Sequence, residues 1–347
     1  MKILIDICHP AHVHFFKNAL RLLEERQCEV IVTSRDKDCT IPLLEQLKIP
    51  HTPLSSTGFG KIRELIDRDI ALYRFVRAHQ PDLLVGVGGT FIAQVGTLSR
   101  IPSIVFYDGD NAILQNIITY PFADQVIVPR CYQGWLPKHT LRYAGYHELA
   151  YLHPHYFKSQ ASAQTIGKPI IFIRHVAHQA NHDLGHHGLS FSMISRLIQD
   201  LPTYQFILSA ESEIPTDLSQ YAYNEPPDQI HHTLERCTAY VGDSPTMASE
   251  AALLGVPGIF VSTHRCGNMQ ELSQRYQLIS IVKPNYSHMI TALKKTLNES
   301  AQTIAARRDF LLNDTIDVTE FIVSCLVKNI SLRQNDKPCH TANSSKH

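Results

Sequence analysis

Short apolar segments alternate along the chain with longer segments in which hydrophobic residues recur every three or four positions. Five apolar segments lie in the first part of the chain: KILIDI (2–7), CEVIVTS (28–34), DLLVGVG (82–88), SIVFYD (103–108) and QVIVP (125–129). Helical periodicity between them is clearest at 13–26 and 61–79. Continuous apolar strands that alternate with helices predict a parallel sheet covered on both faces.

The alternation stops after Gly145, where the chain becomes mixed and polar, and then resumes. Five further apolar segments follow: PIIFIRH (169–175), YQFILSA (204–210), AYVGDS (239–244), PGIFVST (257–263) and ISIVKP (279–284). A chain of 347 residues is long for a single core, so two domains are expected. The sequence predicts two doubly wound, Rossmann-like α/β domains at 1–148 and 169–330, a connection at 149–168 and a disordered tail at 331–347.

Composition and charge exclude several classes of protein. Thirty-two basic and 32 acidic residues balance, so no basic field predicts nucleic-acid binding. No apolar run has the length of a membrane span, and the start MKILIDICHP is expected to be a core strand rather than a signal peptide. The eight cysteines form no Cys-x-x-Cys pair, which is typical of reduced cytosolic thiols. We therefore expect a cytoplasmic protein.

Unusual polar residues follow the predicted strands at five places. HPAHVH, GGT, DGDN, RHVAHQANHD and DSPT each come directly after an apolar run. Ligands of open parallel sheets bind outside the carboxyl ends of the strands. Two such domains facing each other across a cleft would place all five clusters around one site.

The last of these clusters opens a helix. Ser244 suits an N-cap and Pro245 suits the first helical position. Met247 stands where a Glu or Gln would close a capping box, so the first-turn amides and the helix dipole can meet an anion. Thr246 and Glu250 are four residues apart and share a face. A ligand whose phosphate binds at the start of the helix and whose sugar hydroxyl binds Glu250 would use all these residues. The alternative is an ordinary capped helix without a ligand.

The first cluster contains His9, His12 and His14. Two defined histidine positions without a carboxylate make a weak metal pattern. His12 opens a helix and suits proton transfer or acceptor positioning near neutral pH. The plainer alternatives are that His9 fixes the turn and that His14 packs on its helix.

The segment VGVGGTF imitates a dinucleotide fingerprint through Gly86, Gly88 and Gly89. The third glycine of that fingerprint should stand at Phe91, so a nicotinamide cofactor is not expected. The glycines, with Thr90, either serve tight strand-to-helix packing or allow close backbone approach to a sugar or acceptor.

Two further clusters offer charged side chains. Asp108 and Asp110 are paired carboxylates at a strand end, suited either to general base catalysis or to capping the next helix. Arg174 ends another strand and suits a phosphate. His182 and Asp183 are candidates for ligand contact, and the spacing of the neighbouring histidines matches no standard metal site.

Four segments of the chain together resemble the DUF354 family of archaea and bacteria. They are IDICHPAHVHFFK, GYHELAYLHPHYF, the stretch from Arg174 to HDLG, and GDSPTMASEAALLG, and the resemblance runs from Met1 to about Leu326. The family is similar in turn to glycosyltransferases of the GT-B fold and to hydrolysing UDP-N-acetylglucosamine 2-epimerases.

The resemblance assigns roles to individual residues. Residues 11–13 are similar to the Gly-His-Val of the lipid-linked N-acetylglucosamine transferase of peptidoglycan synthesis, and Gly88–Gly89 to its second glycine motif. Asp243, Ser244 and Glu250 match parts of the epimerase motif Asp-Ser-Gly-Gly-x-x-Glu-Glu, in which serine and glycine amides hold phosphate and the last glutamate binds ribose.

The departures from the epimerase pattern favour sugar transfer. Pro245 and Thr246 replace the two glycines, and Ser249 replaces the first glutamate. The His-Arg-x-Glu-Asn signature is absent, and Gly-Gly-Thr at 88–90 lacks the carboxylate of the epimerase Gly-Asp-Thr.

We therefore expect a metal-independent GT-B glycosyltransferase that uses a nucleotide-diphosphate sugar, such as a UDP-sugar, as substrate and needs no cofactor. The expected catalytic residues are His12, Asp108 and Asp110. The expected donor-binding residues are Arg174, His182, Gly242, Asp243, Ser244, Thr246 and Glu250. The expected acceptor-side residues are His14, Gly88, Gly89 and Thr90.

The resemblance also implies a glycan or lipid-linked acceptor and a role in surface glycan or glycolipid synthesis. The basic, amphipathic segment 61–79 would permit peripheral contact with the membrane, and a solvated helix is the alternative. Two alternatives stay open. One is a hydrolysing nucleotide-sugar 2-epimerase, and the other is a non-catalytic nucleotide-sugar-binding protein.

Overall fold

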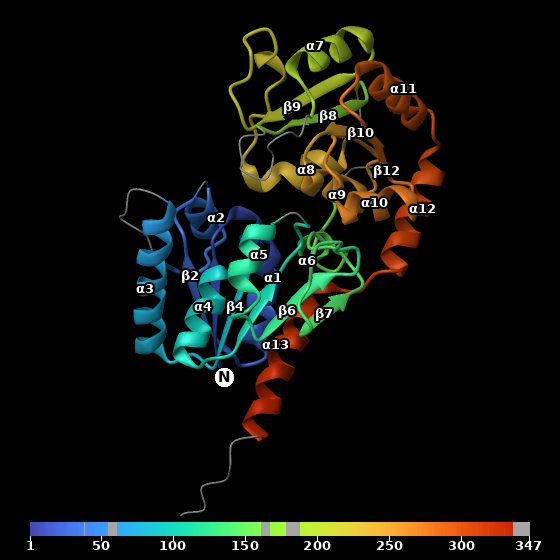
Figure 1. Ribbon diagram of the computed structural model, residues 1–347. Coiled ribbons are helices and arrows are strands. Elements are labelled where there is room, and N and C mark those ends of the chain that lie inside the picture. Colours follow the sequence, from blue (N-terminus) through green and yellow to red (C-terminus); the bar gives the residue numbers. More distant parts are fainter. Residues whose placement is uncertain (38, 55–60, 111, 161–166, 178–187, 336–347) are drawn as a thin grey trace, which may run out of the picture. The chain divides into compact units, whose positions relative to one another are not determined.

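A computed structural model describes residues 1–37, 39–54, 61–110, 112–160, 167–177 and 188–335 (Figure 1). The chain divides into two compact units. The first comprises Met1–Phe106, Pro121–Gln125 and Val318–His347, and the second comprises Tyr107–Tyr120 and Val126–Asp317. The domain boundaries expected from the sequence stay a prediction.

Two parallel sheets form the framework. The first has the strand order β3-β2-β1-β4-β5-β6-β7 and the second has the order β12-β11-β10-β8-β9. The strands are β1 (Lys2–Ile7), β2 (Glu29–Ser34), β3 (Thr52–Pro53), β4 (Leu83–Val87), β5 (Ser103–Phe106), β6 (Gln125–Pro129), β7 (Thr140–Tyr143), β8 (Ile170–His175), β9 (Gln205–Ala210), β10 (Ala239–Gly242), β11 (Gly258–Val261) and β12 (Ile279–Val282). The predicted fold class, parallel α/β sheets with helices, is confirmed.

Helices connect the strands. They are α1 (Pro10–Glu25), α2 (Thr40–Gln46), α3 (Lys61–His79), α4 (Thr90–Ser99), α5 (Ile113–Thr119), α6 (Leu149–Leu152), α7 (Phe191–Asp200), α8 (Ile230–Glu235), α9 (Pro245–Leu254), α10 (Gly267–Gln274), α11 (Tyr286–Leu297), α12 (Ala301–Asn313) and α13 (Val318–Asn335), with short 3₁₀ turns at Ser219–Tyr221 and Pro227–Gln229. The predicted tail starts at 331, whereas α13 continues to Asn335, and 336–347 lie outside the described residues.

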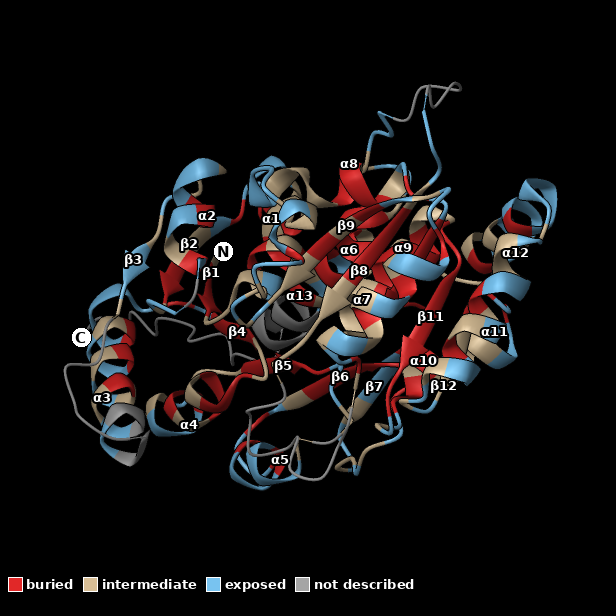
Figure 2. Ribbon diagram, turned by 90° about the horizontal axis from the view of Figure 1, so that it is seen from above, coloured by how far each residue is buried: buried red, intermediate tan, exposed pale blue. Residues whose placement is uncertain are grey.

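The apolar runs of the sequence become the buried strands. All residues of β10 and β11 are buried, and so are all residues of β1 except Lys2 (Figure 2). The helices bury one face and expose the other: α7 buries Ile194 and Leu197 and exposes Arg196 and Gln199. A large aliphatic side chain contributes about 1.5–3 kcal/mol when it is fully buried, so these strands supply much of the driving force for folding.

Each sheet contains one point at which the strand order reverses. In the first sheet β1 lies between β2 and β4, and in the second sheet β8 lies between β9 and β10. The strands that flank each reversal are parallel, with Asp6 opposite Gly86 and Arg174 opposite Gly242. Ligands of doubly wound sheets bind in the crevice outside the carboxyl ends of the strands at such a point. The topology therefore marks the ends of β1 and β4, and of β8 and β10, as candidate sites.

No helix among the described residues has both the length and the apolar character needed to cross a membrane.

Candidate functional site

The reversal point of the second sheet brings together two of the sequence-predicted clusters. Arg174 lies near the end of β8, and Gly242 ends β10 directly opposite it. A side chain at Gly242 would come within 2.7 Å of the Arg174 carbonyl oxygen and closer still to the Tyr240 hydroxyl. Glycine at this position therefore allows β8 and β10 to approach each other where the chain turns into α9.

The N-terminus of α9 is capped as the sequence predicts. The Ser244 hydroxyl accepts a hydrogen bond from the Met247 amide at 3.3 Å, and Pro245 occupies the first turn. The Tyr240 hydroxyl donates to the Ser244 carbonyl oxygen at 3.2 Å and fixes the turn. Thr246 is half-buried in the first helical turn. The dipole and the amides of this turn make it suitable for an anion.

Glu250 is buried on α9, with 6% of its surface exposed. Its Oε1 accepts hydrogen bonds from the Tyr151 hydroxyl at 2.7 Å and from His231 Nε2 at 3.0 Å. Tyr151 lies on α6 and His231 on α8, and both helices pack against α9. No motif in the sequence indicates these two partners. A ribose hydroxyl bound to Glu250 would join the tyrosine and the histidine around one carboxylate.

Asp243 is buried and anchors two backbone segments. Its Oδ1 accepts from the Val176 amide at 2.8 Å, and its Oδ2 accepts from the Leu189 amide at 3.0 Å. Val176 and Leu189 stand on either side of the residues 178–187. Asp243 therefore holds both ends of the connection between β8 and α7, which is a positioning role. His182 and Asp183, which the sequence suggested as ligand contacts, lie outside the described residues.

Arg174 is paired within its own sheet. Its Nη1 donates to the Ser209 hydroxyl at 2.7 Å, and its Nη2 donates to Glu211 Oε1 at 2.6 Å. Glu211 is largely exposed, so this ion pair is the kind that a phosphate can replace at modest cost. A diphosphate at Arg174 would compete with Glu211 for Nη2.

The reversal point of the first sheet carries the residues that the sequence predicted to face an acceptor. His12 follows β1, while Gly88, Gly89 and Thr90 follow the neighbouring β4. Gly88 has a left-handed backbone with φ +64°, and a side chain at Gly89 would overlap Val105. The left-handed backbone of Gly88 and the close contact of Gly89 with β5 account for these glycines without a ligand, and close approach to a sugar or acceptor stays a prediction. His14 is half-buried on α1.

The backbone sets the tautomer of His12. Its Nδ1 accepts a hydrogen bond from the Cys8 amide at 3.3 Å. In a neutral imidazole one ring nitrogen accepts and the other carries the proton, so the proton of His12 lies on Nε2. A ring in this state donates a hydrogen bond from Nε2 rather than taking a proton there. His9 caps α1 by accepting from the Ala11 amide at 3.2 Å, as the turn-fixing interpretation predicts.

A buried ion pair supports this turn. Arg68 on α3 donates to Asp6 Oδ1 at 2.7 Å, and the two side chains are 1% and 3% exposed. The Thr33 hydroxyl donates to the same oxygen, and the Cys8 thiol lies 3.0 Å from Oδ2. Burial, followed by the Asp6 charge, raises the pKa of Cys8 far above its usual range, so the thiol is not a nucleophile.

The two aspartates after β5 differ in their surroundings. Asp110 accepts from the Gln133 amide at 2.8 Å through Oδ1 and from the Gly267 amide at 2.6 Å through Oδ2. Gly267 begins α10, so Asp110 serves the N-terminus of a helix distant in sequence. The capping alternative left open by the sequence concerned the next helix, α5, whose N-cap residue Ala112 makes no side-chain cap hydrogen bond. Asp108 is exposed and is the better candidate for a base.

Two buried titratable side chains, His147 and Glu148, directly precede α6. Burial and the Asp108 charge raise the pKa of Glu148 well above its ordinary value of 4.5. Burial lowers the pKa of His147, whose Nδ1 is 2.9 Å from the Tyr143 hydroxyl. The segment GYHELAYL, interpreted as a connection, thus places two buried titratable side chains, whose charged forms burial disfavours, directly before α6. Its mixture of polar and apolar residues is the pattern that predicted a linker.

The sequence matches a known family over most of its length. A family described as "Protein of unknown function (DUF354)" matches residues 1–280. An uncharacterized protein of Methanocaldococcus jannaschii is 27% identical over 128 residues, which cover 36% of this chain and 38% of that protein. This chain therefore matches less than two thirds of that relative's length.

Solved structures of two kinds share the fold. The UDP-GlcNAc 2-epimerase of Methanocaldococcus jannaschii is 13% identical, with a TM-score of 0.67 over 94% of this chain and 100% of that one. The spinosyn rhamnosyltransferase SpnG is 12% identical, with a TM-score of 0.66 over 96% of this chain and 100% of that one. At these identities the likeness shows the fold, which is that of GT-B proteins.

Proposed function

We propose a function for this chain, which belongs to the family described as "Protein of unknown function (DUF354)": it is a GT-B-type glycosyltransferase that uses a nucleotide-diphosphate sugar as donor. One observation carries the proposal. The Ser244-capped start of α9 lies at the reversal point of the second sheet, with Glu250 on the same helix. The fold shared with a UDP-GlcNAc 2-epimerase and a rhamnosyltransferase supports it.

The donor would bind along α9. The first-turn amides and Thr246 would meet the diphosphate, and Glu250 would accept from the ribose. Arg174 would exchange Glu211 for a phosphate oxygen and stabilise the leaving diphosphate. These groups supply the positive potential without a metal ion, which is the basis for proposing metal-independent transfer.

The acceptor hydroxyl would lose its proton to Asp108. Asp110 is less suited to this role because both of its oxygens accept backbone amides. His12 would donate from Nε2 to an oxygen of the substrate, since its Nδ1 is held by the Cys8 amide. Catalysis would thus rely on one carboxylate base and on donors placed by the backbone.

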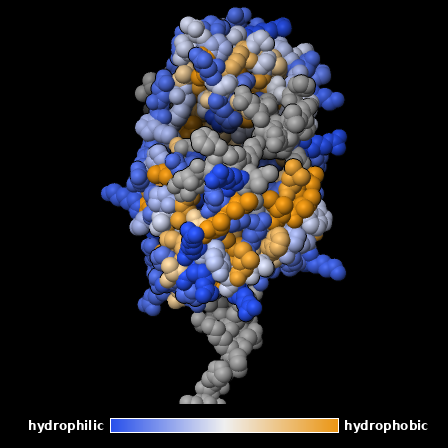
Figure 3. All heavy atoms as spheres, turned by 60° about the vertical axis from the view of Figure 1, so that its left-hand side comes forward, coloured by the Kyte–Doolittle hydropathy of each residue, from blue (hydrophilic) through white to orange (hydrophobic). Residues whose placement is uncertain are grey.

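A lipid-linked acceptor is the finer part of the proposal. On α3, Ile66 is 51% exposed and Ile70 is 45% exposed, and Figure 3 shows hydrophobic side chains on the side of the molecule that carries this helix. Exposed isoleucines on a helix that also carries basic residues suit contact with a membrane surface. Co-flotation with anionic vesicles, reduced in Ile66→Ser/Ile70→Ser, would support this contact, and unchanged flotation would contradict it.

A hydrolysing 2-epimerase is the second candidate, and one observation favours it: the fold matches that of the UDP-GlcNAc 2-epimerase of Methanocaldococcus jannaschii over 94% of this chain. That chemistry needs two carboxylates at the sugar, for which Asp108 and Asp110 are the candidates. An epimerase would release nucleotide diphosphate from the donor alone. A transferase would release it only when an acceptor is present.

The first experiment is a thermal-shift series with UDP-, GDP-, dTDP- and CMP-sugars on the wild type and Glu250→Gln. A ligand that binds only the folded state raises Tm by mass action. We expect one nucleotide family to raise Tm in the wild type and to raise it much less in Glu250→Gln. No shift with any nucleotide, from folded protein, would refute the donor site. Binding without release of nucleotide diphosphate under any acceptor condition would identify a non-catalytic binding protein.

A further inference from the structure

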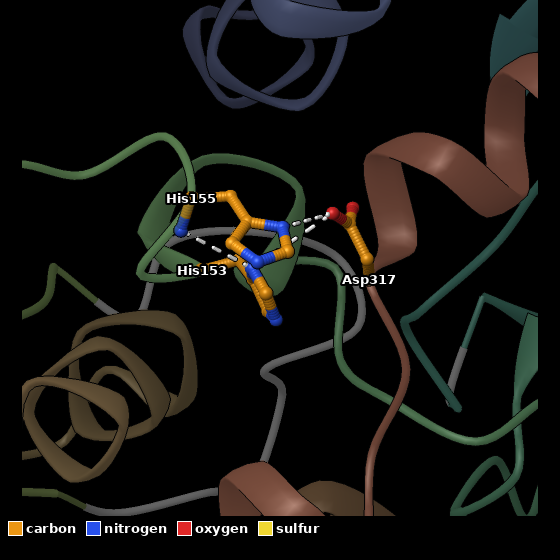
Figure 4. A group of neighbouring side chains, drawn as sticks. All are labelled: His153, His155 and Asp317. Atoms are coloured by element: carbon orange, nitrogen blue, oxygen red, sulfur yellow. Dashed lines mark hydrogen bonds and ion pairs between the residues drawn. The ribbon is translucent and has the colours of Figure 1, made fainter.

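Two histidines and an aspartate converge at the end of α6. His153 and His155 follow this helix, and Asp317 directly precedes α13 (Figure 4). One potential ligand atom of each residue lies within 4.8 Å of those of the other two. Among the described residues, this group of His, Cys, Asp and Glu side chains is the one with spacing suited to a metal ion.

The distances are close to those of a coordination sphere. His155 Nδ1 lies 3.0 Å from Asp317 Oδ2, and His153 Nδ1 lies 3.9 Å from the same oxygen. Zinc binds histidine nitrogen at about 2.0–2.1 Å, which in a tetrahedral site separates neighbouring ligand atoms by about 3.3–3.4 Å. The two measured separations lie on either side of that value. Side-chain rotations alone could therefore bring the three atoms onto one ion.

The backbone and a neighbouring tyrosine position these ligands. The turn after α6 is closed by the Tyr156 and Phe157 amides, which both donate to the His153 carbonyl oxygen. The Tyr156 hydroxyl donates to Asp317 Oδ2 at 3.1 Å, the kind of outer hydrogen bond that orients a metal-binding carboxylate. The two imidazole rings meet edge to face, with centroids 4.5 Å apart.

One hydrogen bond competes with metal binding. The His155 amide donates to His153 Nδ1 at 3.3 Å, which is beyond the usual N–H···N or N–H···O length. His155 is 70% exposed at its side chain, so water can take over this amide if the nitrogen turns to a metal. The competition is therefore weak.

We infer that His153, His155 and Asp317 bind a divalent transition-metal ion of the zinc type. Two imidazole nitrogens and one carboxylate oxygen match the ligand preference of Zn²⁺, and water would complete the four positions. The ion would link the turn after α6 to the residue before α13, two points 162 residues apart along the chain. The site uses none of the residues assigned to the sugar donor or acceptor, so its role is structural and independent of the proposed function.

The test is metal binding by tag-free full-length protein that has been treated with chelator. We expect isothermal titration with Zn²⁺ to show one tight site, and Co²⁺ to give visible d–d bands of a four-coordinate ion. Tm should rise with Zn²⁺. His155→Ala removes an exposed ligand without a core change, so it should keep the metal-free Tm while Zn²⁺ affinity falls at least tenfold.

Two controls separate this site from other histidines. His139→Ala removes an exposed histidine elsewhere and should leave the titration unchanged. His186→Ala/His187→Ala tests the histidine-rich segment of the sequence. Loss of the tight site in that double variant, with retention in His155→Ala and Asp317→Asn, would overturn the assignment, and so would the absence of any tight site in the wild type.

Discussion

The hydroxyl of Tyr151 donates a hydrogen bond of 2.7 Å to Glu250 Oε1, and both side chains are buried. Burial and the Glu250 charge raise the pKa of Tyr151 well above its ordinary value, so the phenol remains protonated and acts as a donor. The bond connects α6 to α9 and fixes the carboxylate that the proposed donor site needs. His231 donates to the same oxygen at 3.0 Å, when its Nε2 carries the proton.

Tyr151→Phe should weaken both the fold and the proposed site. Removing a donor to a buried carboxylate should lower the free energy of unfolding by about 2 kcal/mol, and nucleotide affinity should fall because Glu250 is less well oriented. Urea denaturation and ligand-induced Tm shifts measure the two effects. Tyr286→Phe is the matched control, since Tyr286 also donates to a carboxylate, Asp200, but at the exposed surface. Equal losses of unfolding free energy in the two variants would show that the buried Tyr151 hydrogen bond stabilises the protein no more than an exposed one.

Asp243→Ala should release the backbone on both sides of 178–187. Two amides lose a charged acceptor that is 3% exposed, so the free energy of unfolding should fall by about 3 kcal/mol. Hydrogen exchange should become faster at Val176 and Leu189. Asp217→Ala, at an exposed aspartate, is the control and should change stability by less than about 0.5 kcal/mol. Unchanged exchange at the two amides would contradict the anchoring role.

Much of the fold was predictable because it depends on local patterns. Each of the ten apolar runs identified in the sequence overlaps a strand, since a strand buried on both faces must be apolar throughout. The sequence missed β3 and β7, which are a two-residue strand and the polar edge strand TLRY. Edge strands need no continuous apolar run, so periodicity does not reveal them.

The site was predictable only where a motif lies within one turn. Ser244 and Pro245 start α9 as expected, because capping depends on neighbouring residues. The partners of Glu250 could not be found this way, since Tyr151 is 99 residues away. Asp110 shows the same limit, because its acceptor role depends on Gly267, 157 residues along the chain.

Glu148→Gln should stabilise the protein at neutral pH and not in acid. Folding raises the pKa of Glu148, so the folded state favours the protonated acid, and folding becomes costlier as pH rises above the unfolded value of 4.5. Glutamine removes that cost. The gain at pH 7.5 should exceed the roughly 0.5 kcal/mol of a neutral surface change, and it should disappear near pH 4. Urea unfolding midpoints of the wild type and the variant at pH 7.5 and pH 4 measure this gain. A stability gain of equal size at the two pH values would contradict the link between the Glu148 pKa and stability.

Arg68→Met should destabilise the first unit strongly. It leaves the buried Asp6 carboxylate without its cation, which typically costs about 3–5 kcal/mol. Adding Asp6→Asn removes the unpaired charge, so the double variant should be more stable than the sum of the single losses predicts. Denaturant unfolding of the four proteins measures the coupling. Simple additivity would mean that the ion pair contributes nothing as a pair.

His12→Asn should distinguish whether His12 acts as a hydrogen-bond donor or as a general base, provided that the protein transfers sugar as proposed. An asparagine oxygen can replace Nδ1 as the acceptor of the Cys8 amide, so the variant should fold normally while it lacks the Nε2 donor. Loss of one donor to a developing negative charge lowers kcat by roughly a hundredfold. Because Asp108 is the proposed base, the acid limb of the pH–rate profile should stay where it is in His12→Asn and disappear in Asp108→Asn. An acid limb that disappears in His12→Asn instead would assign the base to the histidine and contradict the tautomer set by Cys8.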